Sequence, residues 1–235
     1  MSFSNRFKGG EILDSRMFDV INATWNPVIG CLHNCQYCWA RALTETRLRN
    51  MEKYRDGFKP KLVDYELKKR FHRKFVFVSD MGDLFGDWVP KEWIVKVLEA
   101  IRNSPRSYFL FLTKNPRRYM EFIDMYPGNV VLGATIETNR EYEVSRAPAH
   151  IERYKSMAEL PLKNKLISIE PVMDFDLETF TQWIKDINPA IVYVGYDNYN
   201  NRLPEPSLDK TKQLIEKLKS FTRVRIKTLR ESSQN

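Results

Sequence analysis

Three cysteines, Cys31, Cys35 and Cys38, follow one another with the spacing C-x3-C-x2-C, and the chain contains no other cysteine. Thiolates this close in the chain can each bind one iron of a cubic [4Fe-4S] cluster, which leaves the fourth iron without a protein ligand. An open position on a bound metal is where a reacting molecule is activated, as in catalytic zinc sites. The spacing therefore predicts an iron–sulfur centre that takes part in a reaction.

Other roles for the cysteines stay open at this point. Three is an odd number of cysteines, which does not favour disulfides. The run Met1–Arg6 lacks the apolar segment of a secretory signal, so we expect a cytoplasmic protein. Clustered cysteines in a reducing compartment are typical of metal or redox sites. A structural zinc site would need a fourth ligand, and His33 would be the nearest, but it lies between two of the cysteines on a short loop. We interpret His33 as a loop residue or a neighbour of the cluster, with zinc or free thiols as the alternatives.

The size and composition of the chain narrow its class. Its 235 residues are enough for one well-filled hydrophobic core, so we expect a single domain over 1–235. With 43% hydrophobic and 29% charged residues, the composition is that of an ordinary globular protein in water. No apolar run approaches the ~20 residues that cross a bilayer, so we expect no membrane partner.

The net charge of +8 is concentrated in two segments. Residues 41–74 contain twelve Lys and Arg against five Asp and Glu, and residues 210–230 contain eight against one. A solvated helix face can carry such charges. Two basic segments beside a slightly acidic remainder are also typical of a protein with an anionic partner, most often nucleic acid.

Six short apolar runs, each followed by polar residues or glycine, predict β-strands. The runs are continuous rather than alternating, which is typical of strands that are covered on both faces. They cover residues 19–23, 74–79, 108–113, 129–135, 165–170 and 190–195, and residues 224–228 would add a short terminal strand.

Helical patterns lie between these runs. Trp93, Val97, Leu98 and Ile101, for example, recur at helical spacing after Pro90. Alternating strands and helices predict an α/β fold of parallel β/α units with right-handed crossovers. The expected helices cover residues 39–49, 63–71, 90–101, 116–123, 152–159, 177–184 and 208–218.

In parallel β/α folds the chemistry lies at the carboxyl ends of the strands. The polar residues that follow the six runs are therefore the candidates for a functional site, and we expect them to converge on one opening. They are the three cysteines, Asp80, Gly82, Asp83, Thr113, Lys114, Asn115, Thr135, Glu137, Asn139, Glu170, Tyr196, Asp197 and Asn198.

The cysteine spacing after the first of six β/α units, with the aromatic Tyr37 before the last cysteine, resembles the radical S-adenosylmethionine (radical SAM) superfamily. Within it, the chain is similar to the phage Gp37/Gp68-like, DUF5131-type branch. The stretches that carry this resemblance are Trp25–Cys31, Ser79–Phe85, Leu112–Arg118, Leu132–Thr138 and Ile167–Pro171.

The resemblance implies a partial (β/α)6 TIM-like barrel that is open laterally, with a core at about 19–200 and a basic C-terminal extension at 205–235. It also implies a [4Fe-4S] cluster on Cys31, Cys35 and Cys38, with S-adenosylmethionine bound at the open iron. An electron from an external flavodoxin-like or ferredoxin-like donor would cleave that cofactor to a 5′-deoxyadenosyl radical, which would abstract hydrogen from a substrate.

The resemblance also suggests roles for single residues in binding the cofactor. Tyr37 would lie near adenine. Asp80 and Asp83 stand where the superfamily has a Gly-Gly-Glu run that holds the methionine amino group, and this departure leaves open which carboxylate serves. The remaining candidates are Thr135 and Glu137 for ribose or methionine, and Lys114 and Glu170 for cofactor or substrate.

A six-unit barrel leaves a lateral gap between its first and last strands, and the two basic segments would border that gap. We therefore expect an anionic substrate, such as a nucleic acid that is too large for the barrel, with a small anionic metabolite as the rival. The leading hypothesis is a radical SAM enzyme. The second is a non-catalytic metal-cluster module that binds nucleic acid.

Overall fold

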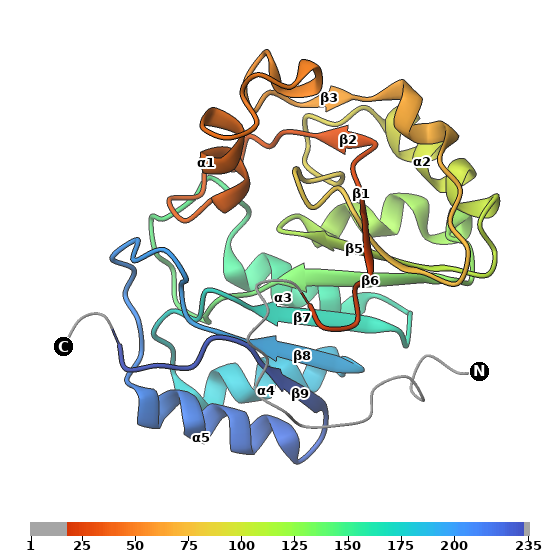
Figure 1. Cartoon of the computed structure of the whole chain (residues 1–235). Coiled ribbons are helices and arrows are strands. Elements are labelled where there is room, and N and C mark those ends of the chain that lie inside the picture. The colour runs from red at the N-terminus through yellow and green to blue at the C-terminus, as the bar shows by residue number, and fades with distance from the viewer. Residues whose placement is uncertain (1–17, 233–235) are drawn as a thin grey trace. The chain divides into compact units, whose positions relative to one another are not determined.

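The computed structural model describes residues 18–232. The N-terminal run that bears on a secretory signal, and residues 233–235 of the expected extension, lie outside this range. Seven strands form one sheet in the order β1-β4-β5-β6-β7-β8-β9 (Figure 1). Their bounds are β1 Ala23–Trp25, β4 Phe75–Val78, β5 Tyr108–Thr113, β6 Val130–Thr135, β7 Lys165–Ile169, β8 Ile191–Val194 and β9 Arg223–Ile226.

The pairs β1–β4, β4–β5, β7–β8 and β8–β9 are all parallel. The side chains of β4, β7 and β8 are all buried, as continuous apolar runs predict, whereas the edge strands β1 and β9 are only partly buried. The α/β fold with a mostly parallel, open sheet is thereby confirmed, and β9 confirms the terminal strand. The helices are α1 Trp39–Glu45, α2 Lys91–Arg102, α3 His150–Glu159, α4 Leu177–Ile187 and α5 Leu208–Lys219, with 3-10 segments η2 Glu52–Tyr54, η3 Asp64–Lys68 and η4 Pro116–Met125.

The first part of the chain departs most from the sequence-based expectations. The first strand begins at Ala23 rather than at residue 19, because Asp19 is used elsewhere: it accepts a hydrogen bond from the Tyr193 hydroxyl (2.6 Å). The helix expected over 63–71 is only the 3-10 segment η3. A short antiparallel pair, β2 (Val28–Ile29) with β3 (Lys61–Leu62), was not predicted, because two residues are too few to show a pattern.

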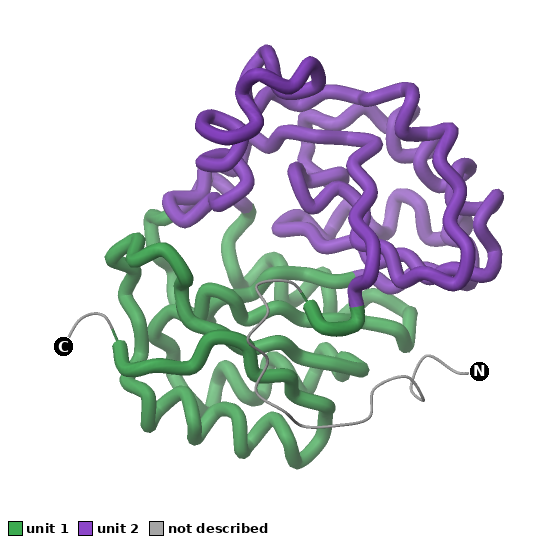
Figure 2. Tube along the Cα trace, viewed as in Figure 1, with its two compact units in different colours: residues 1–20, 133–144, 148–235 green, residues 21–132, 145–147 purple. Residues whose placement is uncertain are grey.

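The chain folds as two compact units (Figure 2). Unit 1 comprises residues 1–20, 133–144 and 148–235, and unit 2 comprises residues 21–132 and 145–147. The division falls inside β6, whose first three residues belong to unit 2. The expectation of a single domain over 1–235 stays a prediction.

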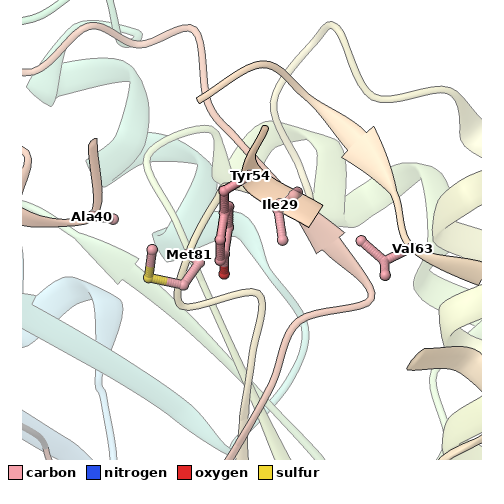
Figure 3. Close-up of a cluster of buried hydrophobic side chains, with 5 residues drawn as sticks. All are labelled: Ile29, Ala40, Tyr54, Val63 and Met81. Carbon is pink, nitrogen blue, oxygen red and sulfur yellow. The ribbon is translucent and has the colours of Figure 1, made fainter. Parts of the chain in front are cut away.

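Unit 2 contains a hydrophobic cluster around β2, α1 and η2. Ile29, Ala40, Tyr54, Val63 and Met81 are buried together (Figure 3). The partly buried side chains of Cys38, Leu43, Leu48 and Phe58 pack against this cluster. The cluster therefore supports the end of the cysteine loop and the first turn of α1.

Unit 1 packs its helices beside β7, β8 and β9. α4 contacts both α3 and α5, and α5 also contacts β9. Between α3 and α4, the rings of Tyr154 and Trp183 stack with centroids 4.6 Å apart and planes 3° from parallel. Lys165, at the start of β7, is buried and donates to the carbonyl oxygen of Met157 in α3 (3.0 Å). Burial lowers the pKa of this lysine, and its Nζ also donates to the carbonyl oxygen of Leu160 (3.4 Å).

Candidate functional site

The three cysteines lie on an irregular loop of unit 2 between β2 and α1, and each is partly exposed. Cys38 is the N-cap of α1, where its sulfur accepts a hydrogen bond from the backbone N–H of Arg41 (3.4 Å). The sulfur of Cys31 accepts a similar bond from the N–H of His33 (3.4 Å). The backbone thus orients two of the three sulfurs.

The loop fits an iron–sulfur cluster by the chemistry of its donors. Three soft sulfur ligands lie in one short segment, and N–H groups that donate to the sulfurs tune such clusters. Over residues 18–232, however, no three His, Cys, Asp or Glu side chains are gathered closely enough to hold a metal ion. Burial, with a smaller effect of the Asp83 carboxylate, raises the pKa of the Cys31 thiol.

The loop is anchored at its start by a close contact of two glycines. Gly30 forms a parallel bridge with Gly82, which belongs to the turn after β4, and its N–H donates to the carbonyl of Met81 (2.9 Å). A Cβ on Gly82 would lie 2.8 Å from the Gly30 carbonyl oxygen, and one on Gly30 would lie 2.2 Å from that of Lys59. Gly30 also has φ +79°, so both its conformation and its surroundings require glycine.

The Asp83 carboxylate, in the same turn, is buried and fully engaged by protein groups. His33 Nε2 lies 2.9 Å from Oδ2, and the Thr113 hydroxyl donates to Oδ1 (2.7 Å). The N–H groups of Lys114 (3.1 Å) and Phe85 (3.0 Å) donate as well. Burial alone would raise the pKa of Asp83, but His33 and Thr113 together hold it below its usual range.

Two further predicted cofactor residues of unit 2 lie near each other. The ammonium of Lys114 is 5.3 Å from the centre of the Tyr37 ring, within range of a cation–π contact. Asp80 is held by one side chain, since Asn26 donates to its Oδ1 (2.6 Å). Burial raises the pKa of Asp80, and the hydrogen bond from Asn26 offsets only part of this effect.

In unit 1, Thr135 and Glu137 lie at the end of β6 and share a partner that the sequence did not reveal. Arg153 of α3 is buried, and its Nη1 donates to Glu137 Oε2 (2.7 Å) and to the carbonyl of Thr135 (3.2 Å). Its Nε donates to the carbonyl of Pro148 (2.7 Å). His150 Nε2 lies 3.2 Å from the same Glu137 oxygen. Glu137 is thus the centre of a buried ionic group that joins β6 to α3.

Glu170 lies after β7 and is paired with a lysine that follows β9. Lys227 Nζ is 2.7 Å from Glu170 Oε2, and the lysine side chain is only 4% exposed. The same ammonium lies 5.1 Å from the centre of the Phe18 ring. Asn198, after β8, donates to the other oxygen of Glu170 (3.4 Å).

In the second basic segment two cations are buried against carboxylates, whereas Lys212, Lys219 and Arg223 are exposed. Arg225 is buried with its Nε 3.5 Å from Asp19 Oδ2, and Lys227 is buried against Glu170. In residues 41–74, by contrast, most cations are exposed: those at 47, 49, 55, 59, 61, 68, 69, 70, 73 and 74.

Unit 2 therefore brings together the cysteine loop, Asp83, Lys114 and Tyr37, and unit 1 holds Thr135 and Glu137 around Arg153, with Glu170 on Lys227. Sequence reasoning named His33 and Asp83 but did not pair them, and it missed Arg153. Fifty positions separate the paired residues His33 and Asp83, so no local pattern links them. Within the described part of the chain, none of the helices is both long and apolar enough to span a bilayer.

The fold is similar to that of spore photoproduct lyase. A structure of a cysteine-to-serine variant of that enzyme has a TM-score of 0.65 at 9% identity, over 94% of this chain and 81% of the lyase chain. Another variant, with bound AdoMet and dinucleoside spore photoproduct, has a TM-score of 0.55 at 10% identity, over 93% of this chain and 73% of the lyase chain. A third structure, complexed with dinucleoside spore photoproduct, gives 0.54 at 9% identity; there the match covers 83% of this chain but only 60% of the lyase chain.

No curated protein matches the sequence. The model of one protein family does match, over residues 17–193, and it is described as a protein of unknown function (DUF5131). That match includes the cysteine loop, the turn after β4 and the ends of β5, β6 and β7. The finer assignment to a phage Gp37/Gp68-like branch stays a prediction. Because the matched residues make up most of the sequence, this chain belongs to the DUF5131 family.

Proposed function

We propose that this protein is a radical SAM enzyme. The observation that carries the proposal is the loop of three partly exposed cysteines, anchored by Gly30 to the turn that follows β4 of a parallel sheet. The same kind of sheet occurs in spore photoproduct lyase, of which one structure contains bound AdoMet. Catalytic loops at the carboxyl ends of parallel strands are the rule in such folds.

In this proposal Cys31, Cys35 and Cys38 hold a [4Fe-4S] cluster. When bound and reduced by an external one-electron donor, the cluster would cleave the sulfonium C–S bond of S-adenosylmethionine and yield methionine and a 5′-deoxyadenosyl radical. The protein's part is to bind and orient the cofactor and to keep water away from the radical.

Of the two carboxylates after β4, the contacts support Asp80 as the group for the cofactor ammonium. Asp83 accepts from two side chains, His33 and Thr113, and from two backbone N–H groups, whereas Asp80 has one side-chain donor, Asn26, besides backbone N–H groups of its own turn. Burial raises the pKa of Asp80, although the hydrogen bond from Asn26 and the charge of Lys53 act in the opposite direction. A bound ammonium group would stabilise the charged form of this carboxylate. Tyr37, with Lys114 beside its ring, is proposed for the adenine.

For the substrate we propose a nucleic acid. The support is the row of exposed cations in residues 41–74, joined by exposed aromatic side chains, Trp39 (39%) and Tyr65 (57%). In proteins that bind single-stranded nucleic acids, cations bind the phosphates and aromatic rings stack on unpaired bases. The spore photoproduct lyase structures with a dinucleoside photoproduct are consistent with this class of substrate. A base within a duplex would have to leave its stack to reach the radical.

The test is anaerobic reconstitution with iron and sulfide, followed by reduction with dithionite, addition of S-adenosylmethionine and chromatography for 5′-deoxyadenosine. The wild type should form 5′-deoxyadenosine, and Cys35→Ala should form none. A matched control is Thr211→Val, which removes a buried hydroxyl in unit 1 and should leave the product unchanged.

A fully loaded and reduced cluster that leaves S-adenosylmethionine intact would refute the enzyme and support the non-catalytic cluster module. Zinc rather than iron in protein purified without oxygen would refute both. The nucleic-acid substrate is tested separately, because binding that does not weaken between 50 and 200 mM salt contradicts recognition through phosphates.

A further inference from the structure

We propose that His33, Asp83 and Thr113 form a positioning network that fixes the cysteine loop to the ends of β4 and β5. The role of this network in metal binding rests on the proposed function, but its role in holding the loop does not. The network joins three segments that are far apart in the chain: the loop itself, the turn after β4, and the last residue of β5.

The carboxylate of Asp83 is the centre of the network. Its Oδ2 faces His33 Nε2 at 2.9 Å and also receives the Thr113 hydroxyl at 2.9 Å. Its Oδ1 receives that hydroxyl at 2.7 Å and the N–H of Phe85 at 3.0 Å. Because Thr113 at the end of β5 and the N–H of Phe85 hold this carboxylate in place, it gives the imidazole of His33 a fixed partner outside the loop.

All three side chains are buried, which makes their hydrogen bonds costly to break. His33 is 3% exposed, Asp83 5% and Thr113 2%. Water cannot replace a lost partner at such positions, and the unpaired group bears the full cost of desolvation. The ring of Trp88 packs edge-on against His33, with centroids 4.7 Å apart.

The loop depends on such anchors because it has no regular structure of its own between Gly30 and Trp39. Its backbone is held at the start by the Gly30 N–H on Met81 (2.9 Å) and by the Cys31 N–H on Phe58 (3.3 Å). In the middle, the carbonyl of His33 accepts from the N–H of Arg146 (2.6 Å). The side chain of His33 is therefore a contact that ties the middle of the loop, between Cys31 and Cys35, to the turn after β4.

This arrangement assigns Asp83 a role distinct from that of Asp80. Asp83 would hold the position of the cysteines, whereas Asp80 would contact the cofactor. The two carboxylates should then respond differently to substitution: changes at Asp83 should disturb the loop before any cofactor is added, and changes at Asp80 should not.

The experiment is peptide-resolved hydrogen exchange on the protein to which no iron has been added. In Thr113→Val, the amides of residues 30–38 should exchange on the order of tenfold faster, since the hydroxyl that donates to the Asp83 carboxylate and accepts from the Asn115 N–H is lost. Thr113→Ser keeps the hydroxyl and should restore slow exchange. Thr211→Val loses a comparable buried hydrogen bond, to Tyr196, and should leave residues 30–38 unchanged.

The second measurement is the visible absorption spectrum and iron content after anaerobic reconstitution. Thr113→Val and Asp83→Asn should bind less iron than wild type, and Thr113→Ser should bind as much. Unchanged exchange of residues 30–38 in Thr113→Val, or an equal increase in Thr211→Val, would overturn the network. If Asp83→Asn does not fold, Thr113→Val still decides the matter. Because hydrogen exchange is measured without iron, its result does not depend on whether the protein is a radical SAM enzyme. A failure of the proposed function would appear in the assay for 5′-deoxyadenosine instead.

Discussion

Replacing Arg153 with methionine should destabilise the protein strongly while keeping an unbranched apolar side chain in place of the arginine's aliphatic stem. The substitution removes the guanidinium that lies 2.7 Å from Glu137 Oε2 and leaves that carboxylate in a fully buried site. It also leaves the carbonyl oxygens of Thr135 and Pro148 without their donor.

The magnitude follows from burial. Breaking a buried ion pair by removal of one partner costs about 3–5 kcal/mol, far more than an exposed pair contributes. With a urea slope of about 2.5 kcal/mol/M, which suits a chain of this length, the midpoint of unfolding should fall by about 1.5 M. Replacing both partners, as Arg153→Met with Glu137→Leu, should cost less than Arg153→Met alone, because no uncompensated charge is then buried.

The assay is urea unfolding followed by far-UV circular dichroism for wild type, both single variants and the double variant. Together these four proteins form a double-mutant cycle that gives the coupling energy. A fall in the midpoint below about 0.3 M for Arg153→Met, or a double variant that is less stable than Arg153→Met, would refute the reasoning. The same proteins decide between two roles of Glu137: a structural role predicts loss of stability without iron or cofactor, and a cofactor-binding role alone predicts none.

Three further predictions concern unit 2. Asp80→Asn should weaken S-adenosylmethionine binding at least about tenfold by calorimetry, yet leave the apo protein no less stable near neutral pH. The sign follows from the raised pKa of Asp80: the wild-type carboxyl favours folding at acid pH and loses that contribution as the pH rises through its folded-state pKa, whereas asparagine does not titrate. Urea midpoints of the two proteins, measured over a range of pH, should therefore converge in acid. A wild type that is more stable than Asp80→Asn at pH 7 would contradict this. Gly30→Ala should lower the free energy of unfolding in urea by about 3 kcal/mol or more, because its Cβ meets a carbonyl oxygen at 2.2 Å. Gly57→Ala, at φ +76° with open space around it, should lower it by only about 1 kcal/mol. Equal losses would be inconsistent with steric crowding at Gly30. Replacing Arg70, Arg73 and Lys74 with glutamate should weaken nucleic-acid binding, measured by fluorescence anisotropy. The slope of log K against log salt concentration should become less steep by about 0.7 to 0.9 per lost phosphate contact, and an unchanged slope would place the contact elsewhere.

The strands could be predicted from the sequence because their signal is local. β5 was predicted to the residue, and β4, β6, β7 and β8 to within one residue at each end, since continuous apolar runs mark strands buried on both faces. The first strand was misplaced, because Val20 and Ile21 extend the apolar run although Asp19 is bonded to Tyr193.

The helical segments were less predictable where side chains compete with the backbone. The helix expected over 39–49 ends at Glu45, and the hydroxyl of Thr46 donates to the carbonyl of Ala42 (2.7 Å). The helix expected after Pro116 is a 3-10 segment with a non-helical residue at Phe122. Spacing of apolar residues does not distinguish these cases from a regular helix.

The candidate site was predictable only as a set of residue types. Cys31, Cys35 and Cys38 are recognisable because their spacing is itself the signal. Which side chain Asp83 or Glu137 would face depends on contacts between segments that are far apart in the chain, and such contacts leave no trace in local spacing.

The stack of Trp183 on Tyr154 makes it straightforward to follow each unit by fluorescence. Of the five tryptophans in the sequence, Trp183 is the one in unit 1, whereas the other four belong to unit 2. A variant that keeps only Trp183 reports the melting of unit 1, and a Trp183→Phe variant reports that of unit 2. Superimposable transitions would mean that the 235 residues behave as one cooperative body, and separate transitions would mean that the two halves can open independently.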